Sequence, residues 1–140
     1  MEIESNLLLK GDSKGALISL EQYSDISFEI KRVFYIFDTK NSTIRGEHSH
    51  YNTKQFLIAV SGSCNIDLDD GENITKHILD RPTKGLYHAP MVWGKMYDFS
   101  SDCVLLVIAS HYYDESDYIR NYDEFKKAVK KRRISTSSVT

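Results

Sequence analysis

The chain has 140 residues, of which 41% are hydrophobic and 27% are charged, and its formal net charge is −2. These values are typical of one globular domain with a hydrophobic core, and they exclude collagen-like, mucin-like and wholly disordered chains. No apolar run reaches the roughly 18 residues of a membrane-spanning helix, and the acidic residues Glu2 and Glu4 are unlike the start of a signal peptide. We therefore expect a single soluble, cytoplasmic domain over residues 1–140.

Basic residues are concentrated near the C-terminus. Residues 126–133 contain six of the 18 Lys and Arg residues. Because no acidic residue follows Glu124, the other 12 bases and all 20 acids lie in residues 1–125, which carry a net charge of −8. This acidic body argues against a general nucleic-acid binder, since the phosphate backbone would be repelled. The basic run is typical of a solvated helix end, where cations complement the helix dipole.

Short apolar segments bounded by turn residues predict strands throughout residues 7–110. In chain order the predicted strands cover residues 7–9, 17–20, 28–37, 55–68 with a break at 61–62, 74–79, 85–88 and 103–109. The Asp-Asp-Gly-Glu run at 69–72 predicts a hairpin turn between two of them. Strands at this spacing predict an all-β sandwich or barrel.

The C-terminal part of the chain predicts a helix. Residues 114–117 resemble a capped first turn, and Tyr122, Phe125 and Val129 recur at helical spacing, which predicts a stripe facing the core. The tail over about 134–140 is rich in Ser and Thr and is expected to fray.

The chain has two cysteines, Cys64 and Cys103, and each lies in an apolar stretch. A single pair at this separation makes neither a disulfide framework nor a zinc site, so both are expected to be buried free thiols.

Arg32 interrupts the most apolar face of the strand predicted over 28–37. By the two-residue period of a strand, that face consists of Phe28, Ile30, Arg32, Phe34 and Ile36. A guanidinium buried there without an anion would cost several kcal/mol. Its partner is either a carboxylate on a neighbouring strand or a phosphate or carboxylate of a ligand inside a barrel, and the sequence leaves both open.

The segment 45–50 carries the pattern most indicative of chemistry. On a strand, His48 and His50 share a face about 7 Å apart, so both imidazoles point into one space. A metal site normally needs a third protein ligand, and Gln55, which stands where one would fit a small β-barrel site, is a poor ligand. The other histidines remain possible donors, although none stands at a comparable spacing: His77, His88 and His111. We therefore favour a metal-free site in which imidazoles transfer protons near neutral pH, the alternative being two hydrogen-bonded structural histidines.

Five longer blocks carry a resemblance to a known family. They are IKRVFYIFD (30–38), RGEHSH (45–50), SGSCNIDLDDG (61–71), GLYHAPMVWGKMYDFSSDCVLLVIAS (85–110) and YYDESDYIRNYDEF (112–125). In these blocks the chain resembles the sugar 3,4-ketoisomerases of deoxysugar biosynthesis, a cupin family that acts on thymidine diphosphate (dTDP)-linked sugars. The match runs from about residue 10 to residue 125.

This resemblance implies a cupin-type jelly-roll barrel and a homodimer. With the C-terminal helix and the metal-free site expected above, we predict an all-β cupin barrel that has a short C-terminal helical segment and needs no cofactor. The resemblance also implies conversion of dTDP-4-keto-6-deoxy-D-glucose to a dTDP-3-keto-6-deoxy-D-hexose through an enediol.

The resemblance further implies roles for single residues. His48 matches the base that removes the proton from sugar carbon 3, and His50 matches a residue that helps return a proton at carbon 4 or orients the sugar. Arg32 and Arg45 match basic positions assigned to the pyrophosphate and the enolate. Gln55 stands where the family also has Gln.

Three positions depart from the family pattern. Lys14 stands where related enzymes have Arg or Tyr, and Phe34 replaces a tyrosine. Gly94, followed by Lys95, stands where the family has His or Arg. These positions lie near the reacting carbons in the family, so the configuration at carbon 4 of the product stays open. Lys14, Lys95 and Tyr97 complete the expected substrate-binding residues, with Lys14 or Tyr97 as a proton relay.

Two other functions stay open. One is a 3,5-epimerase acting on the same nucleotide sugar, which would move protons at carbons 3 and 5 and leave the ketone at carbon 4. The other is a non-catalytic cupin that binds a nucleotide sugar. Deuterium incorporation from solvent distinguishes all three, because each predicts a different labelled carbon or none.

Overall fold

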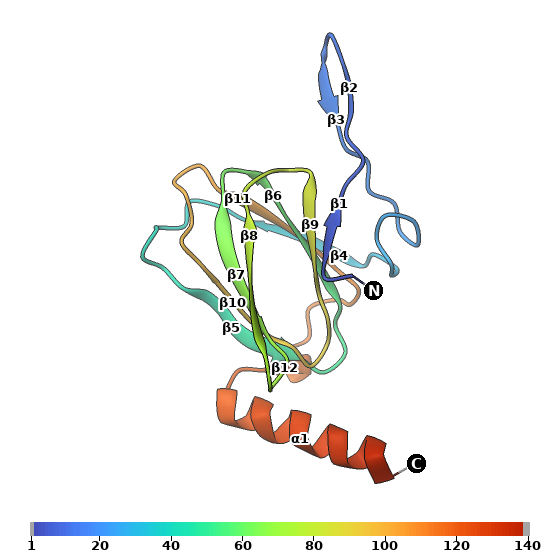
Figure 1. Cartoon of the computed structure of the whole chain (residues 1–140), viewed down its shortest axis with the longest axis vertical. Coiled ribbons are helices and arrows are strands. Elements are labelled where there is room, and N and C mark those ends of the chain that lie inside the picture. Colours follow the sequence, from blue (N-terminus) through green and yellow to red (C-terminus); the bar gives the residue numbers. More distant parts are fainter. Residues whose placement is uncertain (1, 139–140) are drawn as a thin grey trace.

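Two five-stranded antiparallel sheets face each other in a jelly-roll-like sandwich (Figure 1). The computed structural model describes residues 2–138, with side chains up to residue 135. The first sheet has the order β1 (Glu4–Asn6), β9 (Lys84–His88), β6 (Gln55–Ser61), β11 (Val104–Ala109) and β4 (Arg32–Ile36). The second has the order β12 (Tyr118–Ile119), β5 (Arg45–His50), β10 (Trp93–Tyr97), β7 (Cys64–Asp69) and β8 (Ile74–Leu79). The predicted all-β class is confirmed, although the sheets form a sandwich rather than a closed barrel.

The main core fills the space between the two sheets. Alternate side chains of β6 and β11, such as Leu57 and Leu105, point inward and pack against Ile66 of β7. The intervening side chains of the same strands point the other way and form a second cluster on the outer face of the first sheet. That cluster consists of Ile26, Phe28, Phe56, Ile58 and Ile108. Burial on both faces explains why the chain is continuously apolar where β6 begins.

The strand predicted over 28–37 is shorter in the structure. Only Arg32–Ile36 pairs with β11, and the burial of its side chains alternates. Phe28 and Ile30 belong to the outer cluster, whereas Phe34 and Ile36 pack against the main core. Arg32 therefore shares its face with two of the four apolar side chains expected there.

Some of the other predicted strand and turn boundaries are confirmed, and some are wrong. The break after β6 and the turn at 69–72 are confirmed, and Asp69 and Asp70 accept hydrogen bonds from backbone N–H groups within that turn. Residues 7–9 form no strand, and most of 17–20 lies outside one. Instead β2 (Lys10–Asp12) and β3 (Gly15–Leu17) form a separate hairpin that projects from the body of the protein (Figure 1). Strand β10 was not predicted.

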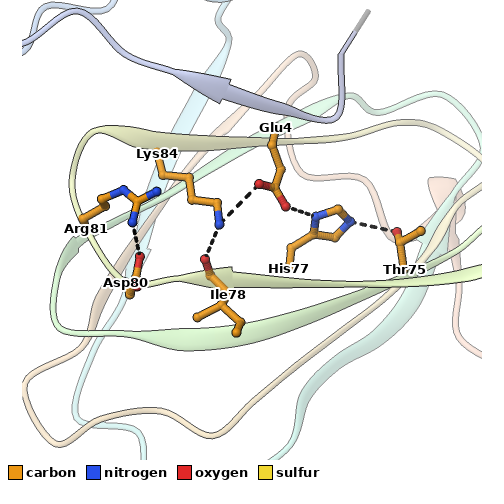
Figure 2. Close-up of polar contacts among 7 residues, drawn as sticks. All are labelled: Glu4, Thr75, His77, Ile78, Asp80, Arg81 and Lys84. Carbon is orange, nitrogen blue, oxygen red and sulfur yellow. Dashed lines mark hydrogen bonds and ion pairs between the residues drawn. The ribbon is translucent and has the colours of Figure 1, made fainter.

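A cluster of charged residues fastens β1 to the rest of the fold (Figure 2). The carboxylate of Glu4 accepts a hydrogen bond from Nδ1 of His77 on β8 and forms an ion pair with Nζ of Lys84 on β9, at 3.2 Å. Nε2 of His77 lies 2.8 Å from the hydroxyl oxygen of Thr75. Because β1 precedes the β2–β3 hairpin directly, this cluster also fixes the base of that hairpin.

Helix α1 (Tyr122–Ser138) lies across the end of the body opposite the β2–β3 hairpin (Figure 1). The predicted apolar stripe is confirmed for Phe125 and Val129, which are buried and pack with Ile119 and Trp93, whereas Tyr122 is 40% exposed. Before the helix, Asp114 caps the short 3₁₀ turn η1 (Glu115–Asp117) by accepting from the backbone N–H of Ser116, as a capped turn requires.

The C-terminal tail and the cysteines complete the comparison with the predicted fold. The expected frayed tail is helical through Ser138, and residues 139–140 lie outside the described residues. Cys64 and Cys103 are buried free thiols, as predicted. No helix among residues 2–138 is long and apolar enough to cross a membrane.

Candidate active site

A cavity of about 370 Å³ lies on the inner side of the sandwich, between β4 of the first sheet and β5 and β10 of the second. Its polar lining consists of Arg32, Thr43, Arg45, His48, Gln55, His88, Tyr118 and Arg120. Its apolar lining includes Phe34, Ile36, Leu57, Ile66, Met96 and Val107. An apolar cavity with a few convergent polar groups is the usual form of a small-molecule site.

His48 and His50 lie on one face of β5, as the alternation of a strand requires. β5 is held between β10 and β12, where His48 pairs with Gly94 and His50 pairs with Tyr118. The imidazole centroids lie 4.9 Å apart with the rings nearly perpendicular. His48 lines the cavity, whereas His50 is 3% exposed and lies behind the lining. Nδ1 of His48 forms no hydrogen bond with any residue in the described part of the chain.

Burial keeps both imidazoles neutral. It lowers the pKa of His50 to about 3, with the neighbouring imidazoles of His48 and His88 acting in the same direction. Burial also lowers the pKa of His48 below 6.5, and the nearby Arg120 guanidinium adds to that effect. At neutral pH, His48 is therefore a free base in contact with the cavity.

Two of the expected cationic residues line the same cavity. The Arg32 side chain is half-buried, and its guanidinium lies over the Phe34 ring, 4.5 Å from the centroid. Among residues 2–135 no carboxylate lies within ion-pair distance of it, so the expected carboxylate on a neighbouring strand is not found there. Arg45 is the first residue of β5 and is exposed at the edge of the cavity. Gln55 is buried and also faces the cavity.

A further group of site residues was not predicted from the sequence. The Tyr118 ring packs against both His48 and His50, with centroids 5.0 and 4.3 Å away. The Arg120 guanidinium lies over Tyr118 and forms a bidentate pair with Glu115 at 2.6 and 2.9 Å. This pairing lowers the pKa of Glu115 to about 2. The only sequence signal for these residues was that all of them lie in one block, 112–125, that resembles the family. β12 has two residues and is too short to show the alternation of a strand.

Three expected substrate-binding residues lie away from this cavity. Lys14 is in the turn of the projecting β2–β3 hairpin, where its backbone N–H donates to Asp12. Lys95 and Tyr97 are on β10, but the alternate residues Gly94 and Met96 line the cavity. Lys95 and Tyr97 therefore point to the opposite face of the sheet.

The contacts of Tyr97 and Lys95 on that face involve one carboxylate. The Tyr97 hydroxyl donates to Asp67 at 2.7 Å, which raises the pKa of Tyr97 to about 12. Lys95 lies 4.0 Å from the same carboxylate. The structure thus corrects the expectation that Tyr97 relays protons, because its hydroxyl is directed away from the imidazole pair.

His88 also lines the cavity, with its ring centroid 6.4 Å from that of His50. Among residues 2–138, no group of three or more His, Cys, Asp or Glu side chains is arranged to hold a metal ion. The chemistry available from the described side chains is proton transfer by imidazole next to guanidinium groups that favour negative charge.

Comparison with known proteins agrees with this geometry. Residues 2–130 match the family model described as FdtA: WxcM-like, C-terminal. The chain is 54% identical over 120 residues to a TDP-4-oxo-6-deoxy-alpha-D-glucose-3,4-oxoisomerase of Aneurinibacillus thermoaerophilus, and the match covers 86% of each chain.

Solved structures give the same result. The TDP-quinovose 3,4-ketoisomerase WlaRB from Campylobacter jejuni is 50% identical with a TM-score of 0.86, covering 89% of this chain and 95% of that one. QdtA, a sugar 3,4-ketoisomerase from Thermoanaerobacterium thermosaccharolyticum in complex with TDP, is 44% identical with a TM-score of 0.89, covering 92% and 94%. The 3'-monoepimerase ChmJ from Streptomyces bikiniensis is 13% identical with a TM-score of 0.73, covering 84% and 70%, and shares the fold alone.

Proposed function

The chain belongs to the FdtA, WxcM-like family and is a sugar 3,4-ketoisomerase, and we propose that its substrate is dTDP-4-keto-6-deoxy-D-glucose. The product is the corresponding dTDP-3-keto-6-deoxy-D-hexose. The observation that carries this proposal is the neutral His48 imidazole, which faces the cavity beside Arg32 and Arg45. A relative of the protein was solved in complex with TDP-4-keto-6-deoxyglucose, which supports the choice of nucleotide and sugar.

His48 is the proposed base. The hydrogen on carbon 3 is acidic because it lies next to the carbon 4 ketone, and His48 removes it while the electron pair moves onto oxygen 4. The resulting enediolate is stabilised by the guanidinium groups, and one proton passes from oxygen 3 to oxygen 4. The His48 imidazolium then returns a proton to carbon 4, which leaves the ketone at carbon 3 and balances the isomerisation.

His50 is assigned an orienting role. It lies behind the cavity lining, and a pKa of about 3 leaves it without a proton to spare at neutral pH. Its ring stands edge to face with His48 at 4.9 Å, which fixes the His48 ring. Positioning of the His48 ring therefore fits the geometry of His50 better than either expected role, which were proton return at carbon 4 and orientation of the sugar. Gln55 and Arg45 are the proposed sugar and pyrophosphate contacts nearest to this pair.

The test follows the reaction by NMR in deuterated solvent. Migration of the ketone to carbon 3 supports the isomerase, deuterium at carbon 5 would instead indicate an epimerase, and an unchanged spectrum with binding would indicate a non-catalytic protein. His48→Asn should abolish turnover while dTDP affinity stays within a few fold. His111→Asn, which changes an exposed histidine outside the cavity, serves as the matched control. Turnover retained by His48→Asn would remove the base from this mechanism.

We also propose that the protein works as a homodimer. Support comes from β4 and its end, where Val33, Tyr35 and Phe37 are 54, 62 and 56% exposed on the outer face. Contiguous exposed apolar side chains of this kind mark protein interfaces. Light scattering should give twice the chain mass, and Tyr35→Asp should shift the population toward the monomer. A monomeric wild-type protein at micromolar concentration would overturn this proposal.

Lys14 enters the mechanism through the second copy. Its hairpin projects from the body of the protein (Figure 1), and none of the hairpin residues lines the cavity of the same chain. We therefore propose that the hairpin lies against the partner and brings Lys14 to the partner's cavity. A mixture of inactive Lys14→Ala and inactive His48→Asn chains should then regain activity after refolding together, because one cavity of each hybrid has both residues. Hybrids that form but stay inactive would restrict the site to one chain.

We propose that the protein is located in the cytoplasm, where a nucleotide sugar is available as substrate. Support comes from Cys64 and Cys103, which lie in hydrogen-bonding contact in the core and remain thiols, as is usual in a reducing compartment.

A further inference from the structure

A third imidazole, that of His88, faces the cavity and has no part in the mechanism above. His88 is the last residue of β9 and pairs with Gln55 of β6. It is 6% exposed and lines the cavity together with His48 and Gly94. A buried imidazole at this position needs a physical explanation.

One hydrogen bond fixes the orientation and the tautomer of this ring. Nε2 of His88 lies 2.6 Å from the carbonyl oxygen of Val92 in the following loop. A carbonyl oxygen only accepts, so Nε2 holds the proton and Nδ1 holds the lone pair. No described residue hydrogen-bonds to Nδ1. Burial lowers the pKa of His88 to about 4, and the His48 imidazole acts in the same direction, so the ring is neutral at neutral pH.

Gly94 provides the space that the His88 ring occupies. Gly94 is buried in the middle of the second sheet and pairs with both His48 and Leu68. Its backbone does not have a positive φ, so a side chain is excluded by space alone. A Cβ at this position would lie 2.5 Å from Cε1 of His88 and 3.2 Å from each ring nitrogen. At residue 94, the neighbour of His48 across the sheet, the cavity lining is therefore formed by an imidazole from β9 instead of a side chain from β10.

Resting on the proposed function, we propose that His88 contacts the substrate and determines its specificity: Nδ1 accepts a hydrogen bond from a hydroxyl of the sugar ring. A neutral acceptor suits a hydroxyl, whereas its lone pair would repel the anionic pyrophosphate. His88 and Gly94 then act as one unit, because the ring fits only where residue 94 has no side chain. The unit would select which ring hydroxyl configuration the cavity accepts.

Substitutions separate this role from a structural one. His88→Ala should raise KM for the dTDP-4-keto sugar about threefold to tenfold, the effect of one lost hydrogen bond, while the Kd of dTDP stays unchanged. The configuration at carbon 4 of the product, measured by NMR, should become mixed. Gly94→Ala should impair the enzyme because its methyl group meets the ring, and His88→Ala in the same chain should restore folding measured as Tm.

A second measurement does not depend on any variant folding. In ¹⁵N-histidine-labelled wild-type protein, the Nδ1 resonance of His88 should move on addition of dTDP-glucose, which lacks the ketone and cannot react, and should not move with dTDP alone. No shift with dTDP-glucose, or an unchanged KM and product for a folded His88→Ala, would overturn the inference. Failure of the proposed function is a separate result, namely absence of ketone migration with the wild-type protein.

Discussion

Removing the carboxylate of Glu4 should destabilise the attachment of β1 and of the hairpin that follows it. In Glu4→Ala, Nδ1 of His77 loses its hydrogen-bond acceptor, and His77 is only 7% exposed. Lys84 loses its ion pair but keeps its 2.7 Å hydrogen bond to the carbonyl oxygen of Ile78. Hydrogen bonds to charged groups contribute about 1.5–3 kcal/mol, and the 40% exposure of the Glu4 side chain reduces this by solvent screening. We expect a loss of about 1–2 kcal/mol in the free energy of unfolding.

Urea denaturation at pH 7 measures this loss, and Glu2→Ala is the matched control because Glu2 is exposed two residues away. The hydrogen bond from His77 lowers the pKa of Glu4 below 4.5, so the carboxylate contributes its stabilisation above pH 4.5 and loses it as the pH falls through the lowered pKa. The difference between wild type and Glu4→Ala should therefore shrink in acid. Amide exchange in β1 should speed up at pH 7. Equal stability of Glu4→Ala and Glu2→Ala, with unchanged exchange in β1, would refute the reasoning.

Two further predictions concern the base and the outer cluster. Because burial lowers the pKa of His48 below 6.5, the midpoint of the acid limb of log kcat/KM should lie below pH 6.5. A midpoint above pH 6.5 would contradict a buried base. Gly85→Ala should lower the free energy of unfolding, measured by urea denaturation, by about 1–3 kcal/mol, because the new Cβ would lie 2.1 Å from Cζ of the buried Phe56 ring. Gly11→Ala is the control and should be close to neutral, because the nearest atom to its new Cβ is 3.5 Å away.

The parts of the fold that could be predicted from the sequence are those in which a local pattern and the tertiary contacts agree. The turn at 69–72 is set by Asp69 and Asp70 side chains that bond to the adjacent backbone, so the local sequence is sufficient. β10 shows the opposite case. Its outward face mixes the aromatic residues Trp93 and Tyr97 with Lys95, and its inward face has a glycine at residue 94, so the strand shows no clear apolar–polar alternation.

The site residues could likewise be predicted only where a local pattern determined their position. His48 and His50 could be placed together because both are on one strand, where a period of two determines the face. Lys95 differs from Gly94 by one position in the same strand, and that step moves it from the cavity to the other face of the sheet. His88 could not be placed beside these residues from the sequence, because β9 and β5 belong to different sheets.

Burial and charge have separate roles in the cavity. Burial lowers the pKa of each imidazole there, so the three rings contribute bases and lone pairs but no positive charge at neutral pH. Positive charge comes from arginines, whose guanidinium groups stay protonated in any such environment. In the proposed mechanism, an enolate would therefore meet fixed cations while the proposed base, His48, stays free to accept the proton. A histidine cation at His50 would add charge but would repel the imidazolium that forms on His48, since the two rings are 4.9 Å apart. In the proposed mechanism, a neutral His50 would therefore allow His48 to hold the proton that moves from carbon 3 to carbon 4.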